Sequence, residues 1–180
     1  PDEIRSIIAS HIENGNKYHI LINNSGGPSS GPILNANTND FLIAFNRHLI
    51  CNHILFQTLF SGMKELKYGR IINIISTSVK QPIIGLGVSN TIRGAVASWS
   101  KTLSLEIASN GITVNNILPG FTKTNRLSKL IENKAIEGGV SIEEIKTKME
   151  SSVPAKRFAE PEETAKAISF LVSPVASYIN

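Results

Sequence analysis

Long hydrophobic runs are missing from this chain of 180 residues. No stretch approaches the roughly 18 to 20 apolar residues that a helix needs to cross a bilayer. The start, Pro1 to Ile4, has neither a basic nor an apolar leader segment. Cysteine occurs once, as Cys51, which we interpret as a small buried hydrophobic residue. A single cysteine excludes an internal disulfide, which fits a reducing compartment. Together with the lack of a long apolar run, this leads us to expect a soluble, cytoplasmic protein with no membrane partner.

Acidic residues are fewer than basic ones, 14 against 18, which leaves a formal net charge of +4. The basic side chains are scattered, and the tightest group, Lys64, Lys67 and Arg70, has no interleaved aromatic residues on which bases could stack. We therefore expect no nucleic-acid partner. The histidines other than His48 show no ligand spacing with one another or with carboxylates, so we expect no metal site.

Short apolar segments alternate with helical patterns along the chain, which is typical of βα units and predicts an α/β fold with a parallel sheet. The composition, 41% hydrophobic and 18% charged, is that of one globular domain. We expect strands over residues 19–23, 70–75 and 112–118. We expect helices over residues 3–14, 38–68, 86–109, 125–136, 142–149 and 161–171. Thr38, Ser141 and Pro161 are the expected helix-start residues, Ser141 in a capping box with Glu144.

The two long helices, 38–68 and 86–109, carry more apolar residues than one sheet face can bury. A second copy of the chain is the natural cover for the remainder, and we expect a homodimer or homotetramer formed through these helices. The alternative is that a larger monomer buries them.

Three segments share an order and spacing that resemble the short-chain dehydrogenase/reductase family. They are Asn23-Asn24-Ser25-Gly26, Gly69-Arg70-Ile71-Ile72-Asn73-Ile74-Ile75-Ser76, and Pro119-Gly120-Phe121-Thr122-Lys123-Thr124. The chain is most similar to the 3-oxoacyl-acyl-carrier-protein-reductase-like members. The resemblance implies a single, partial Rossmann-like domain over residues 1–180, a doubly wound parallel sheet whose first strands and last strand are missing. It also implies a nicotinamide cofactor, NAD or NADP, and a small carbonyl or alcohol substrate.

One departure from the family pattern concerns the phosphate turn. The family opens with a strand and a glycine-rich turn that holds the cofactor pyrophosphate, but no G-x-x-x-G-x-G occurs in these 180 residues. The chain also begins with Pro1 inside what resembles the helix before the fourth strand of the family. We therefore expect a fragment of a longer product.

A second departure concerns the catalytic pair. The family places a Tyr and, four residues later, a Lys on one helix face, where the Tyr gives its proton to the substrate oxygen. The matching residues here are Ser89 and Arg93. A phenol ionises near pH 10 and can be tuned lower, whereas an alkyl hydroxyl is a much weaker acid. Arg93 remains able to hold ribose hydroxyls but cannot relay a proton as Lys does.

Two further residues match catalytic positions of the family. Ser76 matches the Ser that polarises the substrate carbonyl, and His48 falls where the family has an Asn that holds a relay water. Histidine titrates near neutral pH, so His48 is a candidate proton donor. The alternative is a helix histidine with a satisfied hydrogen bond.

Two turns resemble the cofactor contacts of the family. Asn24, Ser25 and Gly26 match the adenine and ribose contact, with Ser25 in place of the usual Ala. Pro119, Gly120 and Thr124 match the turn that clasps the nicotinamide carboxamide. Each turn also has a plain structural alternative: Gly26-Gly27-Pro28 is a sharp exit from a strand, which favours glycine, and Pro119-Gly120 is a loop before a helix. The segment 121–152 would then be a substrate flap.

Three hypotheses remain open from the sequence. The first is an oxidoreductase in which proton delivery comes from His48, from Ser89 within a relay, or from water. The second is a catalytically impaired homologue that binds a dinucleotide or a partner subunit. The third is a structural dimer subunit that needs no nucleotide.

Overall fold

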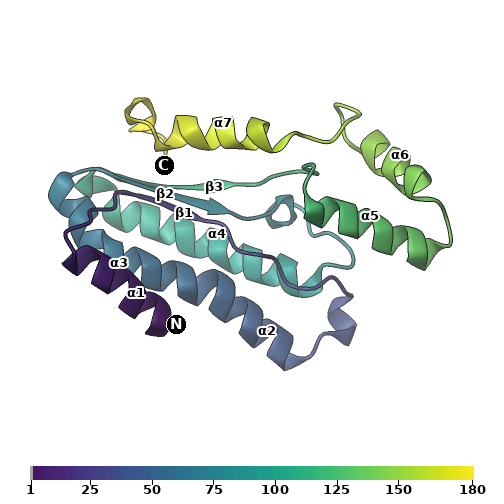
Figure 1. Ribbon diagram of the computed structural model, residues 1–180, viewed down its shortest axis with the longest axis horizontal. Coiled ribbons are helices and arrows are strands. Elements are labelled where there is room, and N and C mark those ends of the chain that lie inside the picture. Colours follow the sequence, from purple (N-terminus) through teal and green to yellow (C-terminus); the bar gives the residue numbers. More distant parts are fainter. Residues whose placement is uncertain (1) are drawn as a thin grey trace. The chain divides into compact units, whose positions relative to one another are not determined.

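A computed structural model describes residues 2–180 and divides them into two compact units. Unit 1 comprises residues 2–118 and 169–180, and unit 2 comprises Pro119–Ile168. Unit 1 holds a parallel sheet of β1 (Ile20–Asn23), β2 (Gly69–Ile74) and β3 (Ile112–Ile117), in that spatial order (Figure 1). The expected α/β fold with a parallel sheet is therefore confirmed, and each strand lies within one residue of its predicted range.

The helices also follow the predicted order. They are α1 (Asp2–Glu13), α2 (Thr38–Phe45), the π-helical turn η2 (Asn46–Ile50), α3 (Cys51–Leu66), α4 (Gly87–Ile107), α5 (Asn125–Gly138), α6 (Ile142–Ser152) and α7 (Pro161–Val172). Short 3₁₀ turns are η1 (Ile33–Asn35), η3 (Thr77–Val79), η4 (Ala108–Asn110) and η5 (Pro174–Ala176). None of the described helices has both the length and the apolar character to cross a membrane.

Two details of the helix predictions are corrected by the structure. The predicted helix 38–68 is interrupted by η2, because one turn takes the wider π form between α2 and α3. Its N-cap is Asn37 rather than Thr38, which is already helical. Asn37 and Asp40 form a capping box in which each side chain accepts a hydrogen bond from the other's backbone N–H, both at 3.0 Å. The Ser141 cap is confirmed, since its hydroxyl accepts from the Glu144 N–H at 3.1 Å.

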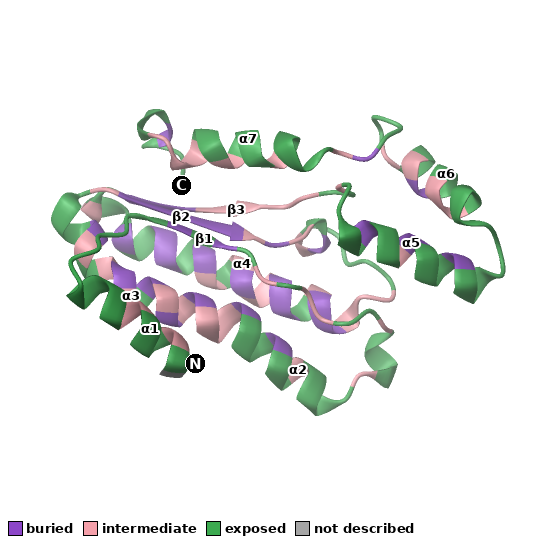
Figure 2. Ribbon diagram, in the orientation of Figure 1, coloured by how far each residue is buried: buried purple, intermediate pink, exposed green. Residues whose placement is uncertain are grey.

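The main core of unit 1 lies between the sheet and helices α3 and α4, which run along the same face (Figure 1). Its buried members are Leu21, Phe56, Leu59, Met63, Ile71, Leu103, Ile107, Ile112 and Val114. Strand β2 is buried almost throughout because it has a neighbour on each side, as the purple strand in Figure 2 shows. In β1 only alternate residues are buried, and Ile20 and Ile22 remain 41% and 47% exposed. Cys51 is half-buried.

The C-terminal segment of unit 1 is held by a buried cation. Arg70, only 2% exposed, donates to the carbonyl oxygens of Gly69, Gly111 and Ser173 at 2.8, 3.3 and 3.4 Å. Its guanidinium also lies 4.2 Å from the ring centroid of Tyr68, whose hydroxyl donates to the Val172 carbonyl at 2.6 Å. The start of β2 is thereby joined to the chain just after α7.

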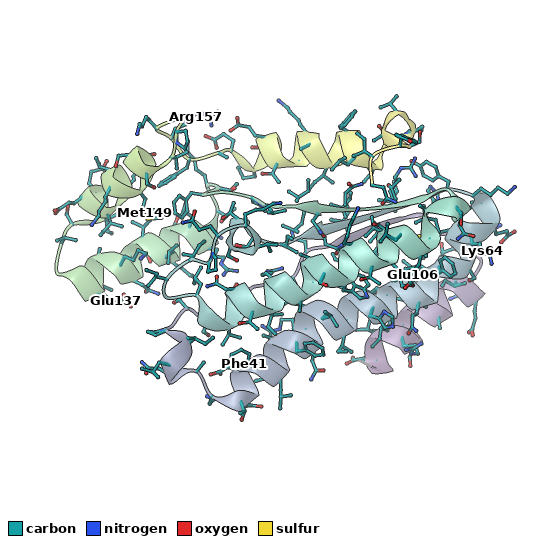
Figure 3. The ribbon with its side chains drawn as sticks, turned by 180° about the vertical axis from the view of Figure 1, so that it is seen from behind. Phe41, Lys64, Glu106, Glu137, Met149 and Arg157 are labelled. Atoms are coloured by element: carbon teal, nitrogen blue, oxygen red, sulfur yellow. The ribbon has the colours of Figure 1, made fainter. Side chains whose placement is uncertain are left out.

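Unit 2 has its own small core. Met149 of α6 packs with Leu127 and Ile131 of α5 and with Phe158 (Figure 3). The Phe158 ring meets that of Phe121 edge-on, with centroids 6.0 Å apart. The segment 121–152, which we predict to be a substrate flap, therefore belongs to a compact body rather than to an irregular loop.

A chain of amides crosses the sheet of unit 1 near its carboxyl edge. Asn23, Asn73 and Asn116 are in register on the three strands. The fully buried Asn73 side chain accepts from the Asn23 amide at 2.8 Å and donates to Asn116 at 3.2 Å and to the Ser100 hydroxyl of α4 at 2.9 Å. A single side chain thus joins all three strands to a helix.

Replacing Asn73 by Ala should destabilise the fold, because it leaves the buried side chains of Asn23 and Ser100 and the half-buried side chain of Asn116 without their partner. We expect the free energy of unfolding to fall by about 2–4 kcal/mol, since each orphaned buried group costs roughly 1–3 kcal/mol. Denaturant titration followed by circular dichroism measures this change. The exposed Asn39→Ala is the matched control and should shift the midpoint little. An Asn73→Ala midpoint equal to that of the control would contradict the role given to the amide chain.

Unit 2 offers a prediction about pH. Arg157 donates two hydrogen bonds of 2.7 Å to the Glu163 carboxylate, and the Glu160 N–H donates a third at 2.8 Å. These bonds favour the charged form, and the pKa of Glu163 falls from 4.5 to about 2. The stability that the charged Glu163 contributes through these hydrogen bonds is therefore complete above pH 4.5 and is lost as the pH falls towards about 2.

The measurement is an NMR titration of the Glu163 carboxyl carbon. We expect its midpoint well below the ordinary value of 4.5, and the control Glu162→Gln, at an exposed neighbour, should leave the Glu163 midpoint unchanged. Glu163→Gln should remove the low-pH loosening of the Glu160 amide in hydrogen exchange. A Glu163 midpoint near 4.5 would show that the pair does not persist in solution.

Candidate active site

Polar residues follow the carboxyl ends of β1 and β2, which lie at the same edge because the strands are parallel and in register. Asn24, Ser25 and Gly26 form the turn after β1, and Ser76 follows β2. In folds of this type ligands bind at that edge.

His48 lies in the π-helical turn η2 and is 1% exposed. Its Nδ1 atom is 2.7 Å from the hydroxyl of Ser25, so the turn after β1 and the helix are directly joined. His48 also borders a cavity of about 530 Å³ together with Asp40, Arg47, Val88 and the loop 27–32. Isolated π turns within α-helices are frequent at functional sites.

Ser76 is half-buried and caps the short turn η3. Its oxygen accepts a hydrogen bond from the Ser78 N–H at 3.1 Å. Because this bond uses a lone pair of the oxygen, the hydroxyl proton remains able to donate to a carbonyl oxygen. The geometry therefore suits the polarising role that the family resemblance implies for Ser76.

Ser89 and Arg93 lie one turn apart on α4 and are both buried. Arg93 Nη1 donates to the carbonyl oxygen of Ile74, the last residue of β2, at 2.7 Å. Ile74 is two residues before Ser76, and α4 packs against η3, which begins directly after Ser76. The start of α4 and the end of β2 are therefore neighbours, and Arg93 is anchored at the junction.

Pro119, Gly120 and Thr124 belong to unit 2. Thr124 is the N-cap of α5, and its hydroxyl accepts from the Leu127 N–H at 3.5 Å. The structure thus gives Thr124 a local structural role, and the contact with a nicotinamide carboxamide remains a prediction.

The donor set fits the ribose side of a nicotinamide cofactor. A methyl group added at Gly26 would meet none of the described atoms within 4 Å, so the backbone of this turn is open to a ligand. Arg93 supplies a permanent cation with several N–H donors for hydroxyl groups. No residues are assigned to the pyrophosphate, because the chain contains no G-x-x-x-G-x-G. Within residues 2–180, no three His, Cys, Asp or Glu side chains gather as a metal site would require.

Sequence reasoning missed two arrangements at this edge. The amide chain through Asn73 was hidden because an isolated Asn in a strand carries no signal of its partners. The contact between Ser25 and His48 was also missed, although both residues stand out as departures from the family pattern. The only sign of this contact in the sequence is that Ser25 and His48 both differ from the usual residues of the family.

The structure is that of an α/β protein with a parallel sheet, and comparisons with known proteins identify the family. The family model described as Enoyl-(Acyl carrier protein) reductase matches residues 1–180. The chain belongs to the short-chain dehydrogenase/reductase family.

Individual relatives agree with this assignment. NADPH-dependent reductase BacG of Bacillus subtilis is 32% identical over 163 residues, which cover 91% of this chain and 63% of that protein. A putative ketoacyl reductase of Streptomyces coelicolor is 31% identical over 98% of this chain and 69% of that protein. The chain thus spans about two thirds of the length of these relatives.

Solved structures show the same likeness. The crystal structure of YwfH, an NADPH-dependent reductase involved in bacilysin biosynthesis, superposes with a TM-score of 0.92 at 30% identity, over 100% of this chain and 70% of that chain. Actinorhodin polyketide ketoreductase F189W with NADPH gives a TM-score of 0.91 at 29% identity, over 99% of this chain and 69% of that chain.

Proposed function

We propose that the protein is an NAD(P)-dependent oxidoreductase that acts on a carbonyl or hydroxyl substrate of 3-oxoacyl type. The observation that carries the proposal is the buried His48, hydrogen-bonded to Ser25 at the sheet edge where Ser76 and Arg93 also lie. A side chain capable of acid–base chemistry and a hydroxyl capable of polarising a carbonyl thus both come from elements at this edge, which supports the proposal. Relatives named as NADPH-dependent and ketoacyl reductases support the same chemistry.

The proposed site residues form two groups, those that bind the cofactor and those that take part in proton transfer to the substrate. Asn24, Ser25, Gly26 and Arg93 of unit 1 would hold the ribose side of the cofactor. The cofactor, when bound, supplies hydride to the carbonyl carbon. Ser76 donates a hydrogen bond to the substrate oxygen, on which negative charge develops.

Proton delivery is the step that the altered catalytic pair leaves open. Ser89 cannot replace a phenol as an acid, because an alkyl hydroxyl does not ionise near neutral pH. The His48 imidazole can carry and give up a proton, so we assign it as the donor, and Ser89 takes at most a relay position.

An apolar groove in unit 1 supports a 3-oxoacyl-like substrate. The groove holds about 680 Å³, and its wall includes Ile33, Leu34, Ile83 and Ile84. The buried Ser78 hydroxyl borders it and has no hydrogen-bond partner among the described residues. An apolar chain with one polar group near its end fits such a lining.

A catalytically impaired, dinucleotide-binding homologue is the second candidate. It is favoured by the replacement of the family's Tyr and Lys by Ser89 and Arg93, which preserves a cation for binding but removes the phenol. In this reading Arg93 and the turn after β1 still hold a cofactor while no turnover follows.

We further propose that the protein works in the cytoplasm as a homodimer or homotetramer. The single Cys51 fits a reducing compartment. On α2, Leu42, Ile43 and Phe45 remain exposed, and on α4 Leu105 is exposed as well. Pairing of these helices with those of a second copy would cover the apolar side chains.

The first test concerns cofactor binding by the full gene product. Arg93→Met should weaken binding of reduced cofactor by about tenfold, because one charge-assisted hydrogen bond contributes roughly 1.5 kcal/mol or more. Titration of cofactor fluorescence measures this, with the exposed Arg5→Met as control and Arg93→Lys in case the Met variant unfolds. Wild-type protein that leaves the fluorescence unchanged at millimolar cofactor would exclude both candidates.

The second test concerns proton delivery. His48→Asn should lower kcat by about 100-fold with cofactor affinity retained, since a general acid contributes roughly 10²–10⁴-fold. Turnover is assayed over a panel of 3-oxoacyl thioesters, ketones and alcohols. His53→Asn, a histidine of α3 whose ring contacts Trp99, is the matched control.

Two outcomes of this assay count against the first candidate. An unchanged rate in His48→Asn would show that the proton comes from elsewhere. A wild-type rate below detection that rises in the double variant Ser89→Tyr, Arg93→Lys would favour the impaired homologue.

A further inference from the structure

One contact between the two long helices of unit 1 joins His53 of α3 to Trp99 of α4. The indole Nε1–H of Trp99 donates to His53 Nδ1 at 3.3 Å, and the two rings meet edge-on with centroids 6.2 Å apart. We propose that this contact is pH-sensitive: it forms when His53 is neutral and breaks when the His53 ring takes up a proton. It involves no residue of the candidate active site and no bound cofactor.

The chemistry of the two rings fixes the direction of this hydrogen bond. The indole nitrogen is a donor only, so Trp99 must donate and His53 Nδ1 must accept. A ring nitrogen of histidine accepts only while it carries no hydrogen, so the contact requires the neutral imidazole with its hydrogen on Nε2. In the imidazolium both ring nitrogens carry hydrogen, and two N–H groups would then face each other.

The contact is part of the packing between α3 and α4. The Phe56 ring, one turn after His53, lies 6.3 Å from the His53 ring and 6.4 Å from the Trp99 ring, between centroids. Phe56 is a buried member of the main core, and Trp99 packs against that core. His53 and Trp99 are themselves half-buried, so neither residue is sealed from solvent. Loss of the hydrogen bond therefore loosens the contact between the two helices at this point.

The charged surroundings of His53 do not favour its protonated form. No described carboxylate forms an ion pair with His53. Arg5 of α1 donates to Gln57, one turn after His53, at 3.5 Å, and a cation there opposes a second positive charge. On α3 itself the titratable or charged residues besides His53 are Cys51, Lys64 and Glu65. On the elements packed against α3 the described ones are Glu3, Arg5, His11, Glu13, Arg47, His48, Arg70, Arg93, Lys101 and Glu106.

The direct test is NMR of both rings in the full gene product, from about pH 8 to about pH 5, which spans the range in which histidines ordinarily titrate. Nitrogen-15 spectra report which nitrogen of His53 carries hydrogen, and Trp99→Phe assigns the indole N–H signal. At the upper end we expect the Nε2–H form of His53 and a hydrogen-bonded indole proton. At the lower end both His53 nitrogens should carry hydrogen, and the indole proton should move upfield. Hydrogen on Nδ1 at the upper end would overturn the proposal.

The matched variant is His53→Asn. The asparagine side-chain oxygen can replace Nδ1 as the acceptor, but it takes up no proton in this pH range. Its indole signal should therefore stay hydrogen-bonded throughout. His11→Asn, at an exposed histidine that pairs with Tyr18, is the control and should leave the wild-type response unchanged. An indole signal that moves equally in wild type and in His53→Asn would show that another group causes the change and that the proposal is wrong.

A double-mutant cycle measures what the contact contributes to helix packing. Trp99→Phe, His53→Leu and the double variant are unfolded in urea at both ends of the pH range. At the upper end the coupling between the two sites should change the unfolding equilibrium constant by about fivefold, the effect of one hydrogen bond. At the lower end the coupling should vanish. A coupling of the same size at both ends would contradict a pH-sensitive contact.

Discussion

The buried amide of Asn73 is the interaction on which the rest of this structure depends. It accepts from β1, donates to β3 and donates to α4, and all of these contacts lie next to the carboxyl ends of the strands. A shift of one residue in either strand pairing would break the chain of amides. The register of the sheet is therefore specified at the same edge from which the turn after β1 and the Ser76 loop leave it.

Much of the fold was predictable because its helices and strands follow from local patterns in the sequence. Apolar alternation with helices, glycines at strand exits and a proline at the start of α7 located each element to within a few residues. The π turn within the long helix was not predictable, since a change of helical pitch leaves the hydrophobic pattern almost unchanged. The N-cap was misplaced by one residue because Asn37 and Thr38 are both good capping residues.

The candidate site was predictable only residue by residue. Motif spacing located Ser76, His48, Ser89 and Arg93, because each occupies a position in a family pattern. Spacing does not show which side chains touch, and the contact of Ser25 with His48 depends on tertiary packing between a helix and a turn. One contact bears on the proposal that Arg93 binds a cofactor rather than transfers a proton. Its guanidinium is anchored to the Ile74 carbonyl, which suits a fixed cation better than a mobile proton carrier.

Arg70 has a consequence for the integrity of the chain. Its charge is permanent and almost fully enclosed, and it donates hydrogen bonds to peptide carbonyls from three places in the sequence. Arginine stays charged because it does not lose its proton in a protein. If the carbonyl groups that accept its hydrogen bonds were lost, water would have to enter to solvate the guanidinium. Loss of the segment after Val172 would therefore leave an unsolvated charge at the start of β2, even though that segment is far from β2 in sequence.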